Sequence, residues 1–165
     1  TGPLSRLVTR VVPKRPEPFG IEPLYLDDIY LEQPAMAIDQ VRRELVRLGG
    51  LVRDMLAHSL RVTVSGTESD VAGLQRADDD VDRLYGECIR YLGKLSQRNL
   101  VLNQPRQLSD FVGIANYLEN VGDVIDKDLL AVAAKRRRNS LVIGPKTQEK
   151  LRELGLEGCP WGVFE

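Results

Sequence analysis

The chain has 165 residues, of which 42% are hydrophobic and 28% are charged, and this is enough for one soluble domain with its own core. The 23 Lys and Arg residues nearly balance the 24 Asp and Glu residues, so the net charge of −1 provides no positive field for nucleic acid. No run of about 18 to 20 apolar residues is present to form a membrane span. Aromatic residues make up only 5%, which favours amphipathic helices over a β-sandwich and predicts an all-α fold.

The N-terminal region, residues 1–33, contains five of the nine prolines. Proline is excluded from helix interiors, so this region is predicted to be a Pro-rich linker or arm. Its segments 25–27 and 29–31 carry apolar side chains that are expected to dock on a neighbouring surface. The sequence opens at Thr1 without an initiator Met, and we therefore expect a piece of a longer protein.

A first long helix is predicted from Pro34, a residue suited to the first turn of a helix. Apolar residues then recur at alternating spacings of four and three until Ser65-Gly66 interrupts them. This spacing is the seam of a heptad pattern. The seam consists of Val41, Leu45, Leu48, Val52, Met55, Ser59 and Val62.

Two further helices share one spacing. Thr67 and Asp70 resemble a capping box that opens the second helix, and Asn103-Gln104-Pro105 separates it from the third. The two seams are Val71, Leu74, Asp78, Val81, Tyr85, Cys88, Leu92 and Leu95, and then Leu108, Phe111, Ala115, Leu118, Gly122, Ile125, Leu129 and Val132. Three helices of about 30 residues with short connections must run up, down and up.

The C-terminal part begins with the basic run Lys135–Arg138. Two interpretations of this run stay open, namely favourable placement at a helix C-terminus and contact with anionic groups at a membrane surface. A short helix is predicted roughly over residues 145–154, with Gly155 as its C′ glycine. We divide the chain into the arm (1–33), a three-helix domain (34–139) and a short helix with a tail (140–165).

Three minor features complete the pattern. Cys88 is predicted to be a buried hydrophobe and Cys159 a tail thiol, and their spacing forms neither a disulfide framework nor a ligand pair, which indicates a reducing compartment. His58 is predicted to be a boundary residue rather than a ligand. A second apolar stripe on the first helix predicts a self-association surface, and it comprises Val46, Leu51, Leu56 and Leu60.

The seam of the second helix is interrupted by Asp78, where the pattern calls for an apolar side chain. A bare carboxylate there is costly unless it is exposed, protonated, paired or bound to a cation. Asp82 lies one turn later on the same side. The third helix carries a matching pair, Glu119 and Asp123, beside a mid-helix glycine, Gly122.

The two carboxylate pairs are predicted to face each other. If the second and third helices form an antiparallel hairpin, Asp78 lies level with Asp123 and Asp82 with Glu119, because both pairs share the same midpoint between residues 100 and 101. Four facing carboxylates provide the oxygen ligands that hard cations prefer. The only histidine lies on the first helix, so di-iron oxygen activation is disfavoured, and no catalytic group or Gly-rich phosphate loop indicates an enzyme.

Two segments together resemble the PhoU family. Residues 78–85, DDDVDRLY, are similar to its E/D-x-x-x-D segment, and residues 117–123, YLENVGD, are similar to its L-E-R-I-G-D segment. Upstream, residues 23–27 (PLYLD), 33–37 (QPAMA) and 43–45 (REL) resemble the start of the PhoU-like domain at the C-terminal, cytoplasmic end of bacterial Na+/phosphate cotransporters. The resemblance spans roughly residues 23–135.

The resemblance implies a three-helix PhoU repeat, two of which build a six-helix bundle, so dimerisation of this chain would complete that bundle. It also implies metal ions, such as Fe, Mn, Mg, Zn or Ca, bound by Asp78, Asp82, Glu119 and Asp123. Lys127 stands where the family commonly has Asn and Asn120 where it commonly has Arg. The Lys127 ammonium, one turn from Asp123, could take the place of a metal.

These expectations combine into one leading hypothesis, a non-enzymatic regulatory domain of a Na+/phosphate cotransporter-like protein. The domain would be a homodimer on the cytoplasmic side of the inner membrane, with a transmembrane transporter domain in the same chain. Two alternatives remain open. One is a free-standing PhoU-type regulator that binds partner proteins of a phosphate ABC transporter or a sensor kinase, and the other is a metal-free helical assembly module whose acidic face is solvated or paired with Arg83 and Lys127.

Overall fold

The computed structural model describes residues 20–65, 68–139 and 141–156. Its elements in chain order are the 3-10 helix η1 (Asp28–Glu32), α2 (Pro34–Ser65), α3 (Glu68–Leu95), α4 (Gln104–Val124), the π-helical turn η2 (Ile125–Leu129), α5 (Leu130–Arg138) and α6 (Pro145–Leu156). No strand occurs within these described ranges. The all-α prediction is confirmed.

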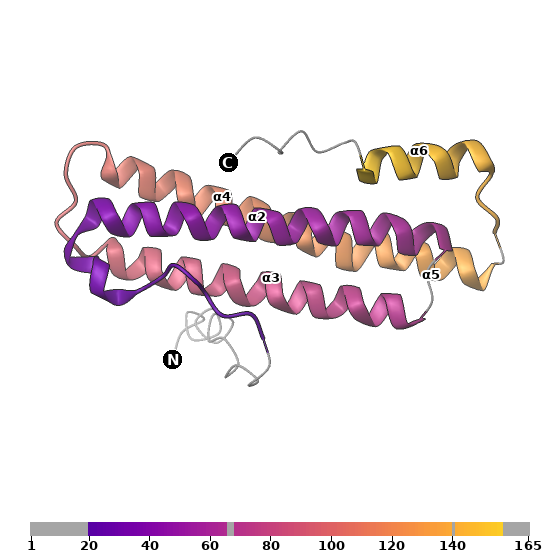
Figure 1. The fold of residues 1–165 in the computed structure, drawn as a ribbon, viewed down its shortest axis with the longest axis horizontal. Helices are drawn as coiled ribbons and strands as arrows, with labels where there is room; N and C mark the ends of the chain where they lie inside the picture. Colours follow the sequence, from indigo (N-terminus) through magenta and orange to yellow (C-terminus); the bar gives the residue numbers. More distant parts are fainter. Residues whose placement is uncertain (1–19, 66–67, 140, 157–165) are drawn as a thin grey trace, which may run out of the picture.

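Three long helices lie side by side and run up, down and up, as Figure 1 shows. The first is α2, which begins at Pro34 as predicted, and the second is α3. The third consists of α4, η2 and α5, which follow one another without a break. The short helix α6 folds back and packs against α2.

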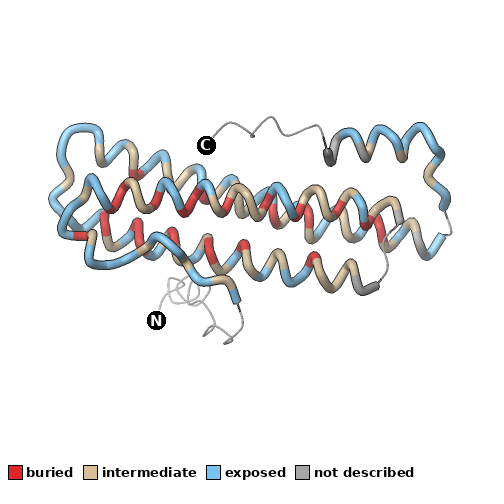
Figure 2. Tube along the Cα trace, viewed as in Figure 1, coloured by how far each residue is buried: buried red, intermediate tan, exposed pale blue. Residues whose placement is uncertain are grey.

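The core lies between the facing sides of these helices, where the buried residues gather in Figure 2. Every residue of the predicted α2 seam is at most 6% exposed, including Ser59, whose hydroxyl donates to the Leu56 carbonyl oxygen at 2.7 Å. In α3, the seam residues Leu74, Val81, Cys88 and Leu92 are buried. The heptad spacing therefore identified the core faces of both helices correctly.

The third seam is correct up to Leu129 and wrong at its end. Val132 was expected in the core, but it is 57% exposed, and Ala133 is buried instead. The cause is the π-helical turn η2, whose backbone hydrogen bonds span one residue more than those of an α-helix, so that the residues after it are shifted by about one position. The core face therefore continues through Ile125 and Ala133, which are buried, and Leu129, which is partly buried.

Other expectations are corrected at the chain's periphery. The helix α6 continues to Leu156, so Gly155 lies inside it and is not a C′ residue. On the expected self-association stripe only Val46 is largely exposed, at 60%, because Leu51 and Leu56 pack against the core and Leu60 is half-buried. The capping residue Thr67, the tail thiol Cys159 and the arm over residues 1–19 lie outside the described residues.

The part of the Pro-rich region that the structure describes packs on the helices of its own chain. Residues 20–27 form no helix or strand and cross α3 before η1 leads into α2 (Figure 1). Leu31 of η1 is 4% exposed, and Ile21, Leu26 and Tyr30 pack against the core. No helix among the described residues is long and apolar enough to cross a membrane.

Candidate metal centre

The α3–α4 hairpin brings the four predicted carboxylates together. In addition to burial, the charge of Asp123 raises the pKa of Asp82, and the charges of Asp123 and Asp82 raise the pKa of Glu119. The pKa of Asp78 is raised by burial and by the charges of neighbouring aspartates, among them Asp82 on its own helix and Asp123 across the hairpin. The facing arrangement that the shared midpoint predicted is therefore present.

A hydrogen bond one turn further along the hairpin fixes the same register. The Tyr85 hydroxyl donates to the Asn116 Oδ1 at 2.9 Å. Residues 85 and 116 have the same midpoint as the two carboxylate pairs, so α3 and α4 stay in one register over several turns. Burial, together with the charges of Glu119 and Asp82, raises the pKa of Tyr85, so its hydroxyl stays protonated and can donate.

Gly122 provides the space in which the helices approach. A Cβ atom at this position would lie 3.2 Å from Val81 Cγ1 and 3.6 Å from Asp78 Oδ1. Val81 is fully buried and β-branched, so it has little freedom to move away. The glycine therefore allows the α4 backbone to lie directly against the Asp78 carboxylate.

Asp78 is the most perturbed acid in the cluster. Burial raises its pKa from 3.8 to about 6, with further contributions from the charges of Asp82, Asp126 and Asp123. Its Oδ1 is buried and has no hydrogen-bond partner among the described residues. A carboxylate in this environment is stabilised by a proton or by a cation.

The neighbouring carboxylates experience the same field. Burial and the charge of Asp123 raise the pKa of Asp82. Burial, followed by the charges of Asp123 and Asp82, raises the pKa of Glu119. In both groups Lys127 acts in the opposite direction. The cluster therefore carries more negative charge than its surroundings compensate.

Asp126 is a member of the cluster that the sequence analysis did not select. It lies in η2, its Oδ1 is buried without a hydrogen-bond partner among the described residues, and its charge raises the pKa of Asp78. The available signal was its spacing of three residues from Asp123, which places it one turn further along the same side of the helix.

Lys127 partly neutralises this cluster. Its Nζ lies 2.5 Å from Asp123 Oδ2, and this hydrogen bond raises the pKa of Lys127. Both side chains are accessible, at 65% for Lys127 and 33% for Asp123. Among the described residues, Asp123 is the one carboxylate of the cluster within ion-pair distance of this ammonium, and the expectation that the lysine takes the place of a metal stays a prediction.

The donor chemistry of the cluster fits a hard cation, but the cluster is not a closed coordination shell. Within the described ranges, no three His, Cys, Asp or Glu side chains stand in an arrangement that would hold a metal ion. Two observations favour a cation. Asp78 and Asp126 each have a buried oxygen without a hydrogen-bond partner among the described residues, and the negative charges of the cluster raise the pKa of Asp78 in addition to burial. Cation binding therefore requires side-chain rotation, including release of Asp123 by Lys127.

The other residues singled out from the sequence have structural roles. His58 is half-buried, and its Cε1 would lie 3.3 Å from a Cβ atom at Gly73, so it packs between α2 and α3. Cys88 is buried, and desolvation raises the pKa of its thiol to about 12. Arg136, from the basic run, donates to the carbonyl oxygens of Thr63 and Val64 at the C-terminus of α2, the latter at 2.9 Å.

Comparison with known proteins identifies the class to which this fold and hairpin belong. The PhoU domain family matches residues 45–127, which is half of the chain and includes the whole carboxylate cluster. The chain belongs to this family, whose members are regulatory helical domains.

Its curated relatives carry the name "Putative inorganic phosphate export protein YjbB". The relative from Salmonella typhimurium is 26% identical over 125 residues, which cover 75% of this chain and 23% of the relative. The relative from Escherichia coli strain K12 is 23% identical over 126 residues, covering 76% and 23%. The chain thus spans about a quarter of the length of these relatives. No solved structure shows significant similarity to it.

Proposed function

We propose that this chain is the regulatory PhoU domain of a longer phosphate-transport protein and that its α3–α4 carboxylates bind metal ions. The observation that carries the proposal is Asp78, whose buried Oδ1 lacks a hydrogen-bond partner in the described chain while burial and the charges of four neighbouring aspartates raise its pKa. An electrostatically unfavourable cluster of this kind costs stability, and proteins retain such clusters where they serve a function.

The phosphate-transport context rests on the relatives. They are named for inorganic phosphate export, and the segment similar to this chain is about a quarter of their length. By analogy, residues 34–139 form the PhoU unit on the cytoplasmic side of the inner membrane, attached to a transmembrane domain of the Na+/phosphate cotransporter type. A domain of this kind is preferred to a free-standing regulator because the named relatives are much longer than a PhoU unit.

The ligands of the proposed site are Asp78, Asp82, Glu119 and Asp123. Carboxylate oxygens suit Fe, Mn, Mg and Ca, and to a lesser extent Zn, so the donor set defines a class of cations rather than one element. Binding would relieve the repulsion among the carboxylates and would free the Lys127 ammonium from Asp123. Cation occupancy is thereby proposed as the signal that the domain registers.

A homodimer belongs to the same proposal. The outer face of α4 carries apolar side chains at spacings of three and four, namely Ile114, Tyr117, Val121 and Val124, each at least 44% exposed. Such a stripe is typical of a helix-packing surface. Sedimentation analysis should give a dimer for the domain, and Tyr117→Glu with Val121→Glu should convert it to a monomer. A monomeric parent domain would remove this part of the proposal.

The cation site is tested by titrating the metal-free domain with Mn2+ and with Fe3+ while heat and elemental content are measured. Saturable binding should be abolished by Asp78→Ala combined with Glu119→Ala. Asp110→Ala, which removes an exposed carboxylate of α4, should retain it. Absence of binding, or binding that survives the double substitution, would favour the metal-free assembly module.

The transport context is tested with the full-length protein in cells loaded with labelled phosphate. The double substitution should change the rate of phosphate efflux at equal protein abundance, whereas Asp110→Ala should not. An efflux rate that depends on the transporter but is the same for both variants would separate the carboxylates from its regulation.

A further inference from the structure

The segment that contains α5 and the start of α6 carries only positive charges. Residues 129–148 include five Lys or Arg residues and no Asp or Glu, and the acids that bound this segment are Asp128 and Glu149. Its cations are Lys135, Arg136, Arg137, Arg138 and Lys146. Because the whole chain has a net charge of −1, this concentration of positive charge is a local property of one part of the molecule.

The structure separates a cation that serves the fold from cations that face solvent. Arg136 is half-buried and donates to the carbonyl oxygens of Thr63 and Val64, so it caps the end of α2. Lys135 and Arg138 lie three residues apart on the outer face of α5, and both are exposed. The helix-terminus interpretation of the basic run therefore applies to Arg136 and leaves these two side chains available for another partner.

The turn after α5 exposes two apolar side chains. Leu141 is 58% exposed and Val142 is 90% exposed. Their backbone is nevertheless held by hydrogen bonds, because the Leu141 N–H donates to the Arg136 carbonyl oxygen at 3.1 Å and the Gln148 side chain donates to the Ile143 carbonyl oxygen at 2.8 Å. The turn therefore presents its apolar side chains in a defined conformation.

The position of this turn suits contact with a flat surface. Figure 1 shows the end of α5, the turn and the start of α6 at one end of the long axis, opposite the α3–α4 connection. Lys146, in the first turn of α6, is exposed at the same end. We call this region the docking end, and it consists of Lys135, Arg138, Leu141, Val142 and Lys146.

Exposed apolar side chains among cations fit the surface of an anionic lipid bilayer. Anionic headgroups attract Lys and Arg side chains, and apolar side chains gain free energy where headgroups meet acyl chains. Nucleic acid would satisfy the cations through its phosphates, but it offers no comparable environment for Leu141 and Val142. The combination of charge and apolar surface therefore favours lipid over nucleic acid.

We propose that the docking end binds the surface of an anionic lipid bilayer, with Leu141 and Val142 entering the headgroup region. The proposal goes beyond the proposed function and does not depend on the cation site, because none of these residues belongs to the carboxylate cluster. A domain attached to a transmembrane region is held near such a surface. Docking would then fix the direction of the long axis of the bundle relative to the membrane.

Sedimentation with lipid vesicles tests the role of charge. The 165-residue chain, in a buffer with a chelator, is mixed with vesicles of phosphatidylcholine alone or with an equal part of phosphatidylglycerol. The parent should bind only the anionic vesicles, and less at high salt. Lys135→Glu with Arg138→Glu should weaken binding by about 25-fold or more, since each cation contributes about fivefold. Arg42→Glu with Arg106→Glu, which reverses two exposed charges toward the opposite end, should weaken it far less.

A fluorescent label tests whether the turn enters the headgroup region. An environment-sensitive fluorophore is attached to Val142→Cys in a chain that also carries Cys159→Ser. Cys88 does not interfere, because it is buried and desolvation raises the pKa of its thiol to about 12. Anionic vesicles should shift the emission of this label to the blue. Leu102→Cys is the matched control, since Leu102 is 96% exposed at the α3–α4 connection and its label should not respond.

Three results would overturn the proposal. The first is a parent chain that does not bind anionic vesicles, or binding that survives Lys135→Glu with Arg138→Glu. The second is a blue shift at residue 102 without one at residue 142. The third is a response of the label at residue 142 to polyglutamate but not to vesicles, which would assign the docking end to an acidic protein surface. Asp78→Ala with Glu119→Ala should bind vesicles as the parent does, so a failure of the cation site and a failure of docking are distinguishable.

Discussion

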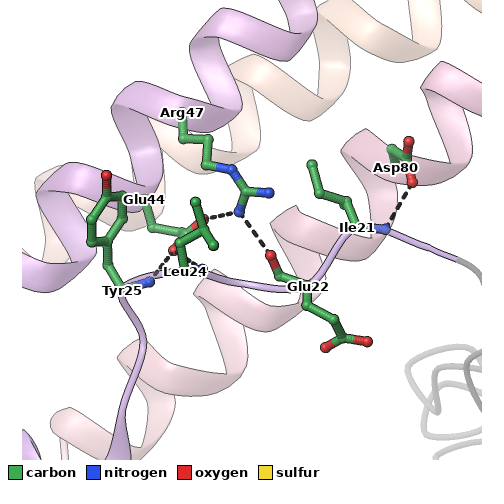
Figure 3. A network of polar contacts seen from close by, with 7 residues as sticks. All are labelled: Ile21, Glu22, Leu24, Tyr25, Glu44, Arg47 and Asp80. Carbon is green, nitrogen blue, oxygen red and sulfur yellow. Dashed lines mark hydrogen bonds and ion pairs between the residues drawn. The ribbon is translucent and has the colours of Figure 1, made fainter.

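Acidic side chains have different environments on the two sides of α3. On the side that faces residues 20–27, which we call the strap, the carboxylates have partners. Asp80 accepts a hydrogen bond from the Ile21 N–H, and Glu22 forms an ion pair with Arg83. Both carboxylate oxygens of Glu44 in α2 accept hydrogen bonds, as Figure 3 shows. On the α4 side, Asp78 and Asp126 each have a buried oxygen without a hydrogen-bond partner among the described residues.

This difference separates acids that build the fold from acids that are available for binding. Burial of a carboxylate is tolerated on the strap side because backbone N–H groups and guanidinium groups compensate for lost hydration. On the α4 side Lys127 compensates for the negative charge only in part, and burial together with mutual repulsion raises the pKa values of Asp78, Asp82 and Glu119. Substitutions on the two sides should therefore change stability in opposite directions.

The largest effect is expected at Glu44. Glu44→Ala removes the buried acceptor of two strap N–H groups and leaves Arg47 without its ion pair, so the free energy of unfolding should fall by about 3 kcal/mol. Glu44→Gln keeps an oxygen acceptor and should cost about 1 kcal/mol. Urea unfolding monitored by circular dichroism measures both. Equal, small losses would mean that the carboxylate does not anchor the strap.

Removing a charge on the other side should stabilise the domain. Asp78→Asn relieves desolvation and repulsion, and after allowance for solvent screening the metal-free domain should gain on the order of 1–2 kcal/mol at about pH 7.5. The same urea experiment, in the presence of a chelator, measures this gain. A loss of stability would show that the Asp78 carboxylate is compensated after all.

The raised pKa of Asp78 should also make the stability of the metal-free domain depend on pH. Asp78 has a pKa of about 6 in the folded chain, against 3.8 as the ordinary value. Between these values the folded state binds more protons than the unfolded state, so Asp78 makes the domain more stable as the pH falls from about 7 to about 4. This contribution is obtained as the difference in the free energy of unfolding between the parent domain and the Asp78→Asn variant, measured across that pH range. A difference that does not vary with pH would contradict the assignment.

The smallest effects are expected at two glycines of α4. A Cβ atom at Gly113 would have no neighbouring heavy atom within 4 Å in the described part of the chain, so Gly113→Ala should stabilise the helix by about 0.5–1 kcal/mol. Gly122→Ala gains the same helix propensity but places its Cβ 3.2 Å from the buried Val81, so it should be neutral or destabilising by up to about 1 kcal/mol. Thermal unfolding measures the stability of both variants. Equal stabilisation by the two substitutions would contradict the close approach of α3 and α4 at Gly122.

Much of this molecule follows from spacing alone. The α2 seam is buried throughout because a regular heptad leaves one stripe to face the core. The facing carboxylates were predicted because a hairpin with a short connection pairs residues about its midpoint, and the Tyr85–Asn116 hydrogen bond follows the same rule. Regular helices and tight connections make such arithmetic reliable.

The sequence could not reveal two features. The π-helical turn shifts the helical register by about one residue, so Ala133 replaced Val132 in the core. The strap was missed because Glu44 binds backbone N–H groups twenty residues earlier, and backbone groups carry no sequence signature. Both depend on tertiary contacts rather than on a local pattern.

The central claim, a cation site at the α3–α4 carboxylates, is tested most directly by the effect of Mn2+ on the free energy of unfolding. At Mn2+ about 100-fold above its dissociation constant, the parent domain should gain about 2.7 kcal/mol. Asp54→Asn with Asp110→Asn, which neutralises two exposed aspartates, should gain the same amount, whereas Asp78→Asn with Asp82→Asn should gain nothing. An equal gain in all three proteins, or no gain in the parent, would contradict the account.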